Sequence, residues 1–293
     1  MFREPAVHEV LTALPHFPVS SFIAKGTFKA AYAGAGAFTS EALKLFHVPP
    51  FANTDDGRAE RAGFVGRFER ELRLLGNCIC PNLVKLGSLQ CQDVVIGGET
   101  FKAYSEELLF GPSLKDLIDQ NQRPSQSELV ELLRALVSGI HELWTSHNAV
   151  HRDIKPGNIV RVNGPPARFV LLDLGITFEA GGTRFTIAPI GPGTPIYYAP
   201  EMLDINYATL LDARTDLYCA GVTAFEYATG SHPLGHPNRG TLEAWIRTHP
   251  PTKLEALRPD LDRNLCSLIN RLNRKRPALR GNLDLALNEL ASF

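Results

Sequence analysis

Apolar and polar residues change their spacing along the chain, and the change divides it into a strand-rich part and a helix-rich part. Short alternating runs predict strands at Ser21–Ala24, Ala30–Ala33, Glu41–Phe46, Val84–Leu89, Gln92–Ile96 and Phe101–Leu109. Among these strands, apolar residues at helical spacing predict a helix over Phe64–Leu75. Residues 47–63 contain prolines, charges and an Asp-Asp-Gly turn, so we expect a loop there.

After Gly111-Pro112 the spacing becomes mainly helical. It predicts helices over Ser113–Gln120 and Ser127–Ser146, and two short strands at Ile159–Val162 and Phe169–Leu172. A loop rich in glycine and proline follows to Pro200, and the remainder is mainly helical. The order predicts an α+β chain of two lobes: an N-terminal extension at 1–20, a β-rich lobe with one helix at 21–108, and a larger helical lobe at 109–293.

The composition is that of an ordinary globular protein. Of 293 residues, 44% are hydrophobic and 21% charged, and the formal net charge of −1 predicts no general attraction to nucleic acid or anionic lipid. No apolar run reaches the length of a membrane span, so we expect a cytoplasmic protein. The five cysteines are an odd number, and Cys78-Ile-Cys80 has no second Cys/His pair close in sequence, so free thiols are expected.

The strongest chemical signal is the segment from His151 to Asn158, which reads His-Arg-Asp-Ile-Lys-Pro-Gly-Asn between a predicted helix and a predicted strand. It fits the H-R-D-x-x-x-x-N catalytic loop, and through it the chain resembles the Hanks-type serine/threonine protein kinases. The resemblance implies a two-lobed kinase fold in which Asp153 accepts or orients the proton of a substrate hydroxyl. It also implies that Lys155 contacts the γ-phosphate of ATP and that Asn158 binds one Mg²⁺ ion.

Two further segments follow in the order that this family shows. Asp173-Leu-Gly resembles the D-F-G motif with leucine in place of phenylalanine, which implies that Asp173 is a second Mg²⁺ ligand. Gly193-Thr-Pro-Ile-Tyr-Tyr-Ala-Pro-Glu resembles the end of an activation segment, in which Thr194 would bond the catalytic aspartate and lysine.

Other residues of the large lobe are implied to have structural roles. Glu201 would pair with a buried arginine, for which Arg280 has the matching context, and Asp216 would hold the backbone of the catalytic loop. Three basic residues near Arg280 are instead expected on a solvated helix face, namely Arg271, Arg274 and Lys275.

The small lobe matches the family less closely. Ala42-Leu-Lys44 resembles the third-strand motif, so Lys44 would bind the α- and β-phosphates and pair with a glutamate of the following helix. Glu69 and Glu71 both lie on that helix. We choose Glu71 because the interval from it to Pro81 matches the family, and an exposed surface pair is the alternative.

The glycine-rich loop departs most from the family pattern. It begins Ala24-Lys-Gly-Thr-Phe-Lys, so Gly26 alone keeps the freedom at positive φ and the close approach to phosphate that glycine allows. The methyl group of Ala24 is a small change. Lys29 brings a cation near the phosphates, but because Lys44 is present we expect Lys29 to be auxiliary or to face outward.

The segment Glu106–Leu114 resembles the family's hinge. Backbone groups of Glu107 to Leu109 would bond adenine, and Glu106 would be an unusually polar gatekeeper. Three apolar residues would enclose the adenine ring, with simple core packing as an equal alternative: Ala31, Ala42 and Val160.

The resemblance therefore implies an ATP- and Mg²⁺-dependent kinase, with Mn²⁺ as an alternative metal, that phosphorylates serine and threonine hydroxyls of a protein substrate. Autophosphorylation through transient self-association would target Thr183 or Thr186. One alternative is a pseudokinase that acts as a nucleotide-binding or scaffold module, which the intact Asp153 and Asp173 oppose. The other is a small-molecule kinase, which the peptide-docking Ala-Pro-Glu201 segment opposes.

Overall fold

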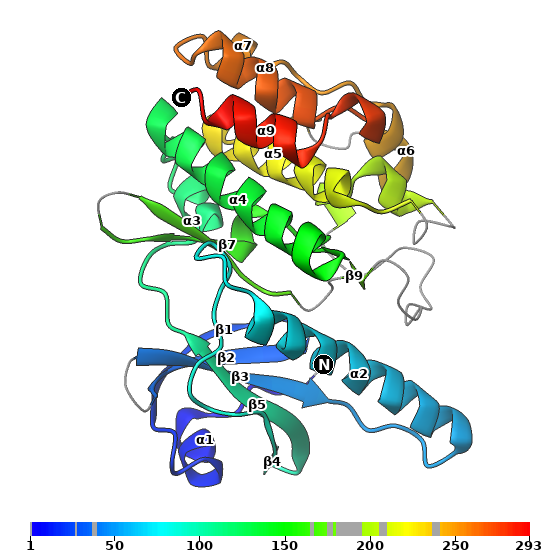
Figure 1. Ribbon diagram of the computed structural model, residues 1–293. Coiled ribbons are helices and arrows are strands. Elements are labelled where there is room, and N and C mark those ends of the chain that lie inside the picture. The colour runs from blue at the N-terminus through cyan, green and yellow to red at the C-terminus, as the bar shows by residue number, and fades with distance from the viewer. Residues whose placement is uncertain are drawn as a thin grey trace. The chain divides into compact units, whose positions relative to one another are not determined.

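A computed structural model describes residues 2–26, 28–36, 40–164, 167–174, 178–179, 195–204, 210–235 and 241–293 (Figure 1). The chain divides into two compact units. The sheet unit contains residues 1–77 and 84–109, and the helical unit contains residues 78–83 and 110–293. Among the described helices, none is long and apolar enough to cross a membrane.

The sheet unit is built on one antiparallel sheet with the strand order β1-β2-β3-β5-β4. Its strands are β1 (Val19–Lys25), β2 (Lys29–Ala35), β3 (Ser40–Val48), β4 (Gln92–Ile96) and β5 (Glu99–Glu107). Its helices are α1 (Val7–Ala13) and α2 (Asp55–Asn77). The α+β organisation expected from the sequence is confirmed, since the other unit is mainly helical.

The two faces of this sheet carry different side chains, because successive residues of a strand point to opposite sides. One face contributes Tyr32, Leu43, Leu45 and Phe101 to a buried core that also contains Val10 of α1. The first 20 residues thus pack against the sheet rather than standing apart from it.

The other face of the sheet carries the buried Glu106 and the partly buried Lys44. The register places Ala31 and Tyr104 opposite Lys44, and Ala42 opposite both Ala33 and Glu106, so these positions share one face. On the same face, the ring of Phe46 stacks on that of Phe68 in α2 with 4.6 Å between centroids. Helix α2 therefore lies over the charged face, and it supplies the carboxylate described below.

Two elements of this unit differ from the sequence prediction. Helix α2 begins at Asp55, nine residues before the predicted start, because Asp55 and Asp56 favour a helix N-terminus even though few apolar residues follow them. The predicted strand Val84–Leu89 forms only an isolated bridge from Leu86 to Glu106 in the sheet. The buried carboxylate of Glu41 accepts the Ser88 N–H at 2.8 Å, which diverts that group from a regular ladder.

The helical unit contains short strands and longer helices. Its helices are α3 (Leu114–Asp119), α4 (Gln126–His147), α5 (Ala213–Thr229), α6 (Leu242–Thr248), α7 (Leu254–Leu257), α8 (Arg263–Leu272) and α9 (Leu283–Leu290). Its strands are β6 (Ala149–Val150), β7 (Ile159–Val162), β8 (Arg168–Leu171) and β9 (Phe178–Glu179), paired as β6–β9 and β7–β8. Short 3₁₀ turns lie at Pro156–Asn158, Pro195–Tyr197, Pro200–Leu203 and Pro277–Leu279.

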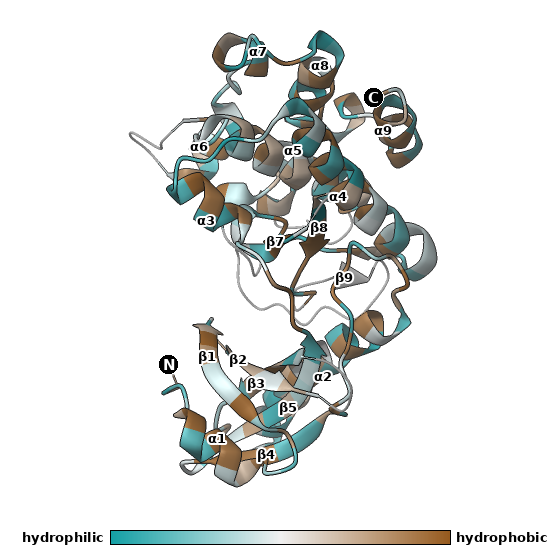
Figure 2. Cartoon of the chain, turned by 90° about the vertical axis from the view of Figure 1, so that its left-hand side faces the viewer, coloured by the Kyte–Doolittle hydropathy of each residue, from teal (hydrophilic) through white to brown (hydrophobic). Residues whose placement is uncertain are grey.

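Helix α5 forms the centre of the helical unit. It contacts α3, α4, α8 and α9, and nearly all of its residues are buried. Most of β8 is brown in Figure 2, which agrees with the burial of Phe169, Val170 and Leu171. This apolar frame fixes the loops that carry the candidate chemistry.

Candidate functional site

The loop from His151 to Asn158 is held at its start by Asp216 of α5. The two carboxylate oxygens of Asp216 accept backbone hydrogen bonds from His151 N at 2.7 Å and Arg152 N at 2.8 Å. Asp216 is fully buried, and this burial raises its pKa. Arg152 has a left-handed φ of 69°, so the loop bends sharply where Asp216 holds it. The loop-holding role expected of Asp216 is confirmed.

Three predicted side chains converge inside this loop. Lys155 Nζ lies 2.6 Å from Asp153 Oδ2, and Asn158 Nδ2 lies 2.9 Å from the same oxygen. Asn158 Nδ2 also donates to the backbone carbonyl of Asp153 at 2.9 Å. These bonds fix the orientation of a nearly buried carboxylate, which is what a residue that accepts a hydroxyl proton requires.

The segment that leads to Asp173 is bonded to the same loop. Leu172 N donates to Asn158 O at 2.8 Å, and Leu172 O lies 3.1 Å from His151 Nε2. Asp173 follows with a left-handed φ of 63°, a conformation that is uncommon for residues other than glycine. Leu174 is 1% exposed, so the leucine of this motif packs in the interior.

The chemistry of Asn158 and Asp173 fits Mg²⁺. The Asn158 amide nitrogen donates to Asp153, which assigns the amide oxygen as the atom that faces a ligand. An amide oxygen and a carboxylate are the hard donors that Mg²⁺ prefers. The Leu172–Asn158 hydrogen bond joins the two segments that carry these donors.

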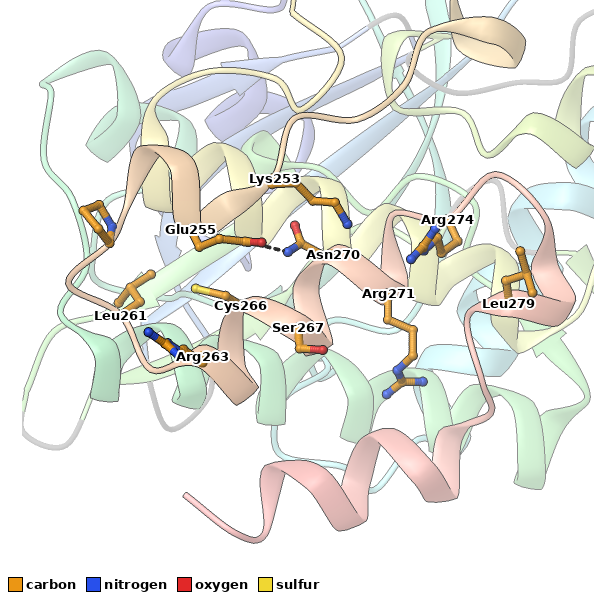
Figure 3. Close-up of a pocket in the computed structure, with 11 residues that line it drawn as sticks. Lys253, Glu255, Leu261, Arg263, Cys266, Ser267, Asn270, Arg271, Arg274 and Leu279 are labelled. Atoms are coloured by element: carbon orange, nitrogen blue, oxygen red, sulfur yellow. Dashed lines mark hydrogen bonds between the residues drawn. The ribbon is translucent and has the colours of Figure 1, made fainter.

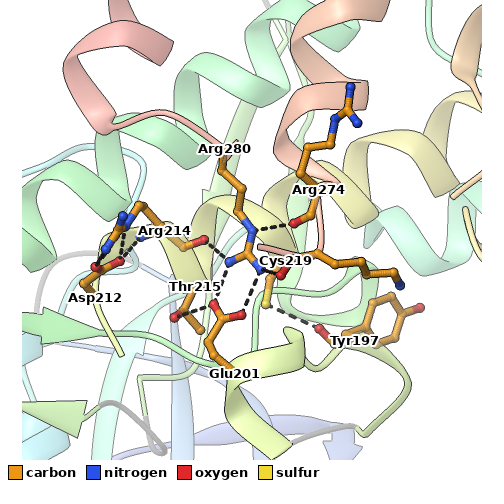
Figure 4. A network of polar contacts seen from close by, with 9 residues as sticks. Tyr197, Glu201, Asp212, Arg214, Thr215, Cys219, Arg274 and Arg280 are labelled. Carbon is orange, nitrogen blue, oxygen red and sulfur yellow. Dashed lines mark hydrogen bonds and ion pairs between the residues drawn. The ribbon is translucent and has the colours of Figure 1, made fainter. Parts of the chain in front are cut away.

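Arg280 and Glu201 form a buried pair, as the sequence predicted (Figure 4). The guanidinium donates to both carboxylate oxygens of Glu201, at 2.6 and 2.8 Å. Its remaining donors bond the backbone carbonyls of Arg214, Arg274 and Lys275. All five N–H groups of a fully buried arginine are therefore used, and they join the Pro200–Leu203 turn to α5 and to the segment after α8.

In the sheet unit, the expected pairing of Lys44 with Glu71 is wrong. Lys29 forms the ion pair with Glu71, while Lys44 Nζ lies 3.0 Å from Glu106 Oε2. Glu71 is 2% exposed whereas Glu69 is exposed, so Glu71 is the carboxylate of α2 that faces inward. Lys29 also faces inward, so of the two expectations for it, auxiliary or outward-facing, the outward orientation is wrong. Both lysines share one sheet face, and the buried Glu106 on that face gives Lys44 a closer partner.

The predicted reason for glycine in the turn between β1 and β2 needs correction. Gly26 donates its N–H to Lys29 O at 2.8 Å, and its φ is not positive. A Cβ built on Gly26 would lie 3.9 Å from its nearest contact, so the backbone itself does not require glycine. What glycine provides here is open space above the turn. Ala24 is exposed in β1, Ala31 is half-buried and Ala42 is buried.

In the segment expected to bind adenine, the backbone N–H of Glu107 already donates a hydrogen bond within the sheet unit. Glu107 N donates to Lys85 O at 2.9 Å, and the Glu107 carboxylate accepts from Lys85 N at 3.1 Å. The sequence pattern gave no sign of these two hydrogen bonds between Glu107 and Lys85. Leu109 is half-buried at the end of the sheet unit, and Val160 lies half-buried in β7 of the helical unit.

Several predicted residues lie outside the described part of the chain, namely Gly175, Thr183, Thr186 and Thr194. Arg274 is exposed as expected, but Arg274 and Lys275 lie past the end of α8 at Leu272, so the predicted helix face is wrong for both. Lys275 instead donates to Ile246 O at 2.6 Å, and burial together with Arg280 lowers its pKa to about 8.

The structure also gathers a group that sequence spacing did not reveal. Ligand atoms of Cys78, Glu142 and His147 lie within 4.8 Å of one another. Both oxygens of Glu142 accept backbone N–H bonds at 2.5 Å, from Ile79 and Cys80. The carboxylate therefore clamps the loop after α2 to α4. All five cysteines are free thiols, as expected.

Comparison with known proteins agrees with this geometry. The sequence profile of the protein kinase domain matches residues 45–290, a range that includes Glu71, Asp153 and Asp173 but not Lys29 or Lys44. Serine/threonine-protein kinase PkaA of Streptomyces coelicolor is 32% identical over 178 residues, which is 60% of this chain and 31% of that protein. The probable serine/threonine-protein kinase PknB of Lactococcus lactis is 26% identical over 217 residues, 72% of this chain and 31% of that protein.

A third relative is the dual specificity mitogen-activated protein kinase kinase mek-1 of Caenorhabditis elegans, 29% identical over 175 residues. That alignment covers 59% of this chain and 48% of the relative, so the chain spans less than half the length of each of these three relatives. The profile match covers most of the chain, and the expected catalytic loop, metal-ligand segment and Glu201–Arg280 pair lie within it. This chain belongs to the protein kinase family.

Proposed function

We propose that this chain is a serine/threonine protein kinase that transfers the γ-phosphoryl group of ATP to protein hydroxyls in the presence of Mg²⁺ or Mn²⁺. The observation that carries the proposal is the convergence of Lys155 and Asn158 on one oxygen of Asp153. A lysine two residues after the aspartate resembles serine/threonine kinases rather than tyrosine kinases. The relatives named serine/threonine-protein kinases support the same specificity.

The proposed step breaks the O–H bond of the substrate and one P–O bond of ATP. The substrate O–H bond breaks as its oxygen forms a bond to the γ-phosphorus, and Asp153 receives the proton. The bond between the γ-phosphorus and the β,γ-bridging oxygen breaks, which releases ADP. Lys155 balances negative charge beside Asp153 during transfer. Mg²⁺ held by Asn158 and Asp173 would neutralise charge on the phosphates.

We also propose nucleotide contacts in the sheet unit and a protein substrate. The carbonyl of Glu107 and backbone groups of Leu109 would bond adenine, and Ala31, Ala42 and Val160 would pack on its faces. Autophosphorylation at Thr183 or Thr186 would proceed through transient self-association. The free cysteines are consistent with a reducing, cytoplasmic location.

One observation favours a second candidate, a nucleotide-binding scaffold without phosphoryl transfer. Lys44, the expected phosphate ligand, is already paired with Glu106. A kinase therefore needs another cation for this task, and Lys29 lies on the same face of the sheet.

Incubation with γ-labelled ATP, Mg²⁺ and a generic basic protein separates the two functions. The kinase predicts label on serine and threonine, seen by phosphoamino acid analysis, and loss of that label in Asp153→Asn. Absence of transfer by the wild type, with ATP binding retained, would establish the scaffold instead.

A further inference from the structure

Two ion pairs lie on the α2-facing side of the sheet. Lys29 in β2 pairs with Glu71 of α2, and Lys44 in β3 pairs with Glu106 of β5. The register places Phe46 opposite Lys29, two residues along β3 from Lys44, so the lysines are diagonal neighbours. Two cations this close repel each other, and each is stabilised by its own nearly buried carboxylate.

The two pairs differ in where their carboxylates lie. Glu71 comes from α2, and in protein kinases the lysine paired with the glutamate of this helix binds the phosphates. Glu106 comes from the sheet itself, one residue before the predicted adenine-binding segment, and it offsets the charge of Lys44. Lys29 also follows the turn at Gly26 directly, where the missing Cβ leaves space.

We propose that Lys29, and not Lys44, is the phosphate-binding lysine of this protein, oriented by Glu71. In this arrangement the Lys44–Glu106 pair is a structural link between β3 and β5. The inference deepens the proposed function and rests on it for the identity of the nucleotide. It assigns the phosphate contact to β2, a strand that the profile match does not cover.

The test removes each pair as a unit, because deleting one partner leaves a buried charge that can unfold the protein. The variants are Lys29→Met/Glu71→Gln and Lys44→Met/Glu106→Gln. Calorimetric titration measures the affinity of each for Mg²⁺-bound, non-hydrolysable ATP and for adenosine. Melting temperature confirms that both variants fold, and the readout does not depend on phosphoryl transfer.

Wild type is expected to bind the triphosphate much more tightly than adenosine. In the Lys29/Glu71 variant the ratio of the two affinities should fall at least tenfold. In the Lys44/Glu106 variant this ratio should stay within about threefold of wild type. The reverse pattern, with loss only in the Lys44/Glu106 variant, would overturn the proposal. Equal loss in both would also overturn it, since the lysines would then share the contact. Intact binding without transfer would refute only the kinase activity.

A separate surface feature supports a second inference. A hollow of about 850 Å³ beside α8 is lined by four basic side chains and one carboxylate, as Figure 3 shows. The basic residues are Lys253, Arg263, Arg271 and Arg274, and the acid is Glu255. Arg271 pairs with Glu289, but within the described residues no ion pair holds Lys253, Arg263 or Arg274.

The positive charge extends past this hollow. An adjoining hollow shares Lys253 and Arg274 and adds Lys275 and Arg276. Burial, and to a lesser extent the charge of Arg280, lowers the pKa of Lys275 to about 8. In a chain of formal net charge −1, this concentration of cations is local rather than general.

The geometry points to a docking groove beside α8 for an acidic segment of a partner or substrate protein. Carboxylate or phosphoryl groups of such a segment would be bound by Arg263, Arg274 and Lys253. Asn270 is occupied, since its amide donates to Glu255 and accepts from Leu254 N, so it does not contribute. Guanidinium groups bind carboxylate and phosphate with two parallel hydrogen bonds.

Fluorescence anisotropy with labelled peptides tests the groove. The probes are an Asp/Glu-rich peptide, the same peptide with phosphoserines replacing the acids, a neutral peptide and duplex DNA. The variant Arg263→Ser/Arg274→Ser should weaken acidic-peptide binding at least tenfold. The matched control Arg58→Ser/Lys115→Ser, which removes equal charge elsewhere, should change it little.

The two acidic peptides distinguish carboxylate from phosphoryl recognition, and preference for either supports the groove. If the control variant lost as much affinity for the acidic peptides, the loss would come from net charge alone and the proposal would be overturned. Tighter binding of duplex DNA than of either acidic peptide would also overturn it.

Discussion

The helical unit and the sheet unit differ in how closely their chemistry follows the sequence motifs. In the helical unit, Asp153, Lys155 and Asn158 meet as one motif predicts, and Glu201 finds Arg280. In the sheet unit, the expected lysine–glutamate pair is replaced by two other pairs. Residues of intact motifs therefore meet as those motifs predict, whereas the pairs of the more divergent sheet unit depend on strand register and on competing partners.

The largest effect on activity is expected from the helical unit. Asp153→Asn removes the proton acceptor while keeping the side-chain shape, so kcat should fall by about 10²–10⁴-fold. Steady-state kinetics with γ-labelled ATP measures this fall, and titration should show ATP affinity within a few-fold of wild type. An unchanged kcat would show that Asp153 does not act on the proton.

The largest effect on stability should also come from this unit. Arg280→Met leaves Glu201 buried without its cation, and we expect a loss of about 3–5 kcal/mol of unfolding free energy. Urea unfolding provides the measurement. The double variant Arg280→Met/Glu201→Met should recover part of the loss, and equal stability of the two variants would contradict the role of the unpaired carboxylate.

A smaller effect in the sheet unit shows whether Gly26 is needed for the open space above its turn or for its backbone conformation. Gly26→Ala should raise the KM for ATP several-fold and leave the melting temperature unchanged, because the added Cβ meets nothing closer than 3.9 Å. A matched change at Gly34, where a Cβ would lie 2.8 Å from Pro18 O, should instead lower the melting temperature. Unfolding caused by Gly26→Ala would show that the turn needs glycine for its conformation.

The smallest expected effect is a pH dependence of stability. The pKa of Lys275 is about 8 in the folded protein against an ordinary 10.5, so the unfolded chain binds the proton more tightly. Stability should therefore rise as pH increases from about 8 to 10.5, and be lower below that window. Comparing wild type with Lys275→Met by thermal unfolding checks this, and parallel pH profiles would refute it.

How much the sequence reveals depends on whether a recognisable motif carries the contact, since the Glu201–Arg280 pair was predicted although its residues lie 79 positions apart. The catalytic loop could be predicted because its residues lie within eight positions of one another, and α5 because its apolar residues are nearly continuous. The start of α2 could not, because Asp55 to Gly63 is mostly polar and contributes little to the core. The Lys29–Glu71 pair joins residues 42 positions apart, and only the β2–β3 register shows that Lys29 and Lys44 share a face.

The assignment of the phosphate contact to Lys29 is tested most directly by kcat/KM for ATP. It is measured by γ-phosphoryl transfer in wild type, Lys29→Met/Glu71→Gln and Lys44→Met/Glu106→Gln at one pH and salt concentration. We expect a fall of at least 100-fold, about 2.7 kcal/mol of transition-state stabilisation, for the first variant and less than tenfold for the second. A larger fall in the Lys44/Glu106 variant would contradict the assignment to Lys29 and restore Lys44 as the phosphate-binding lysine.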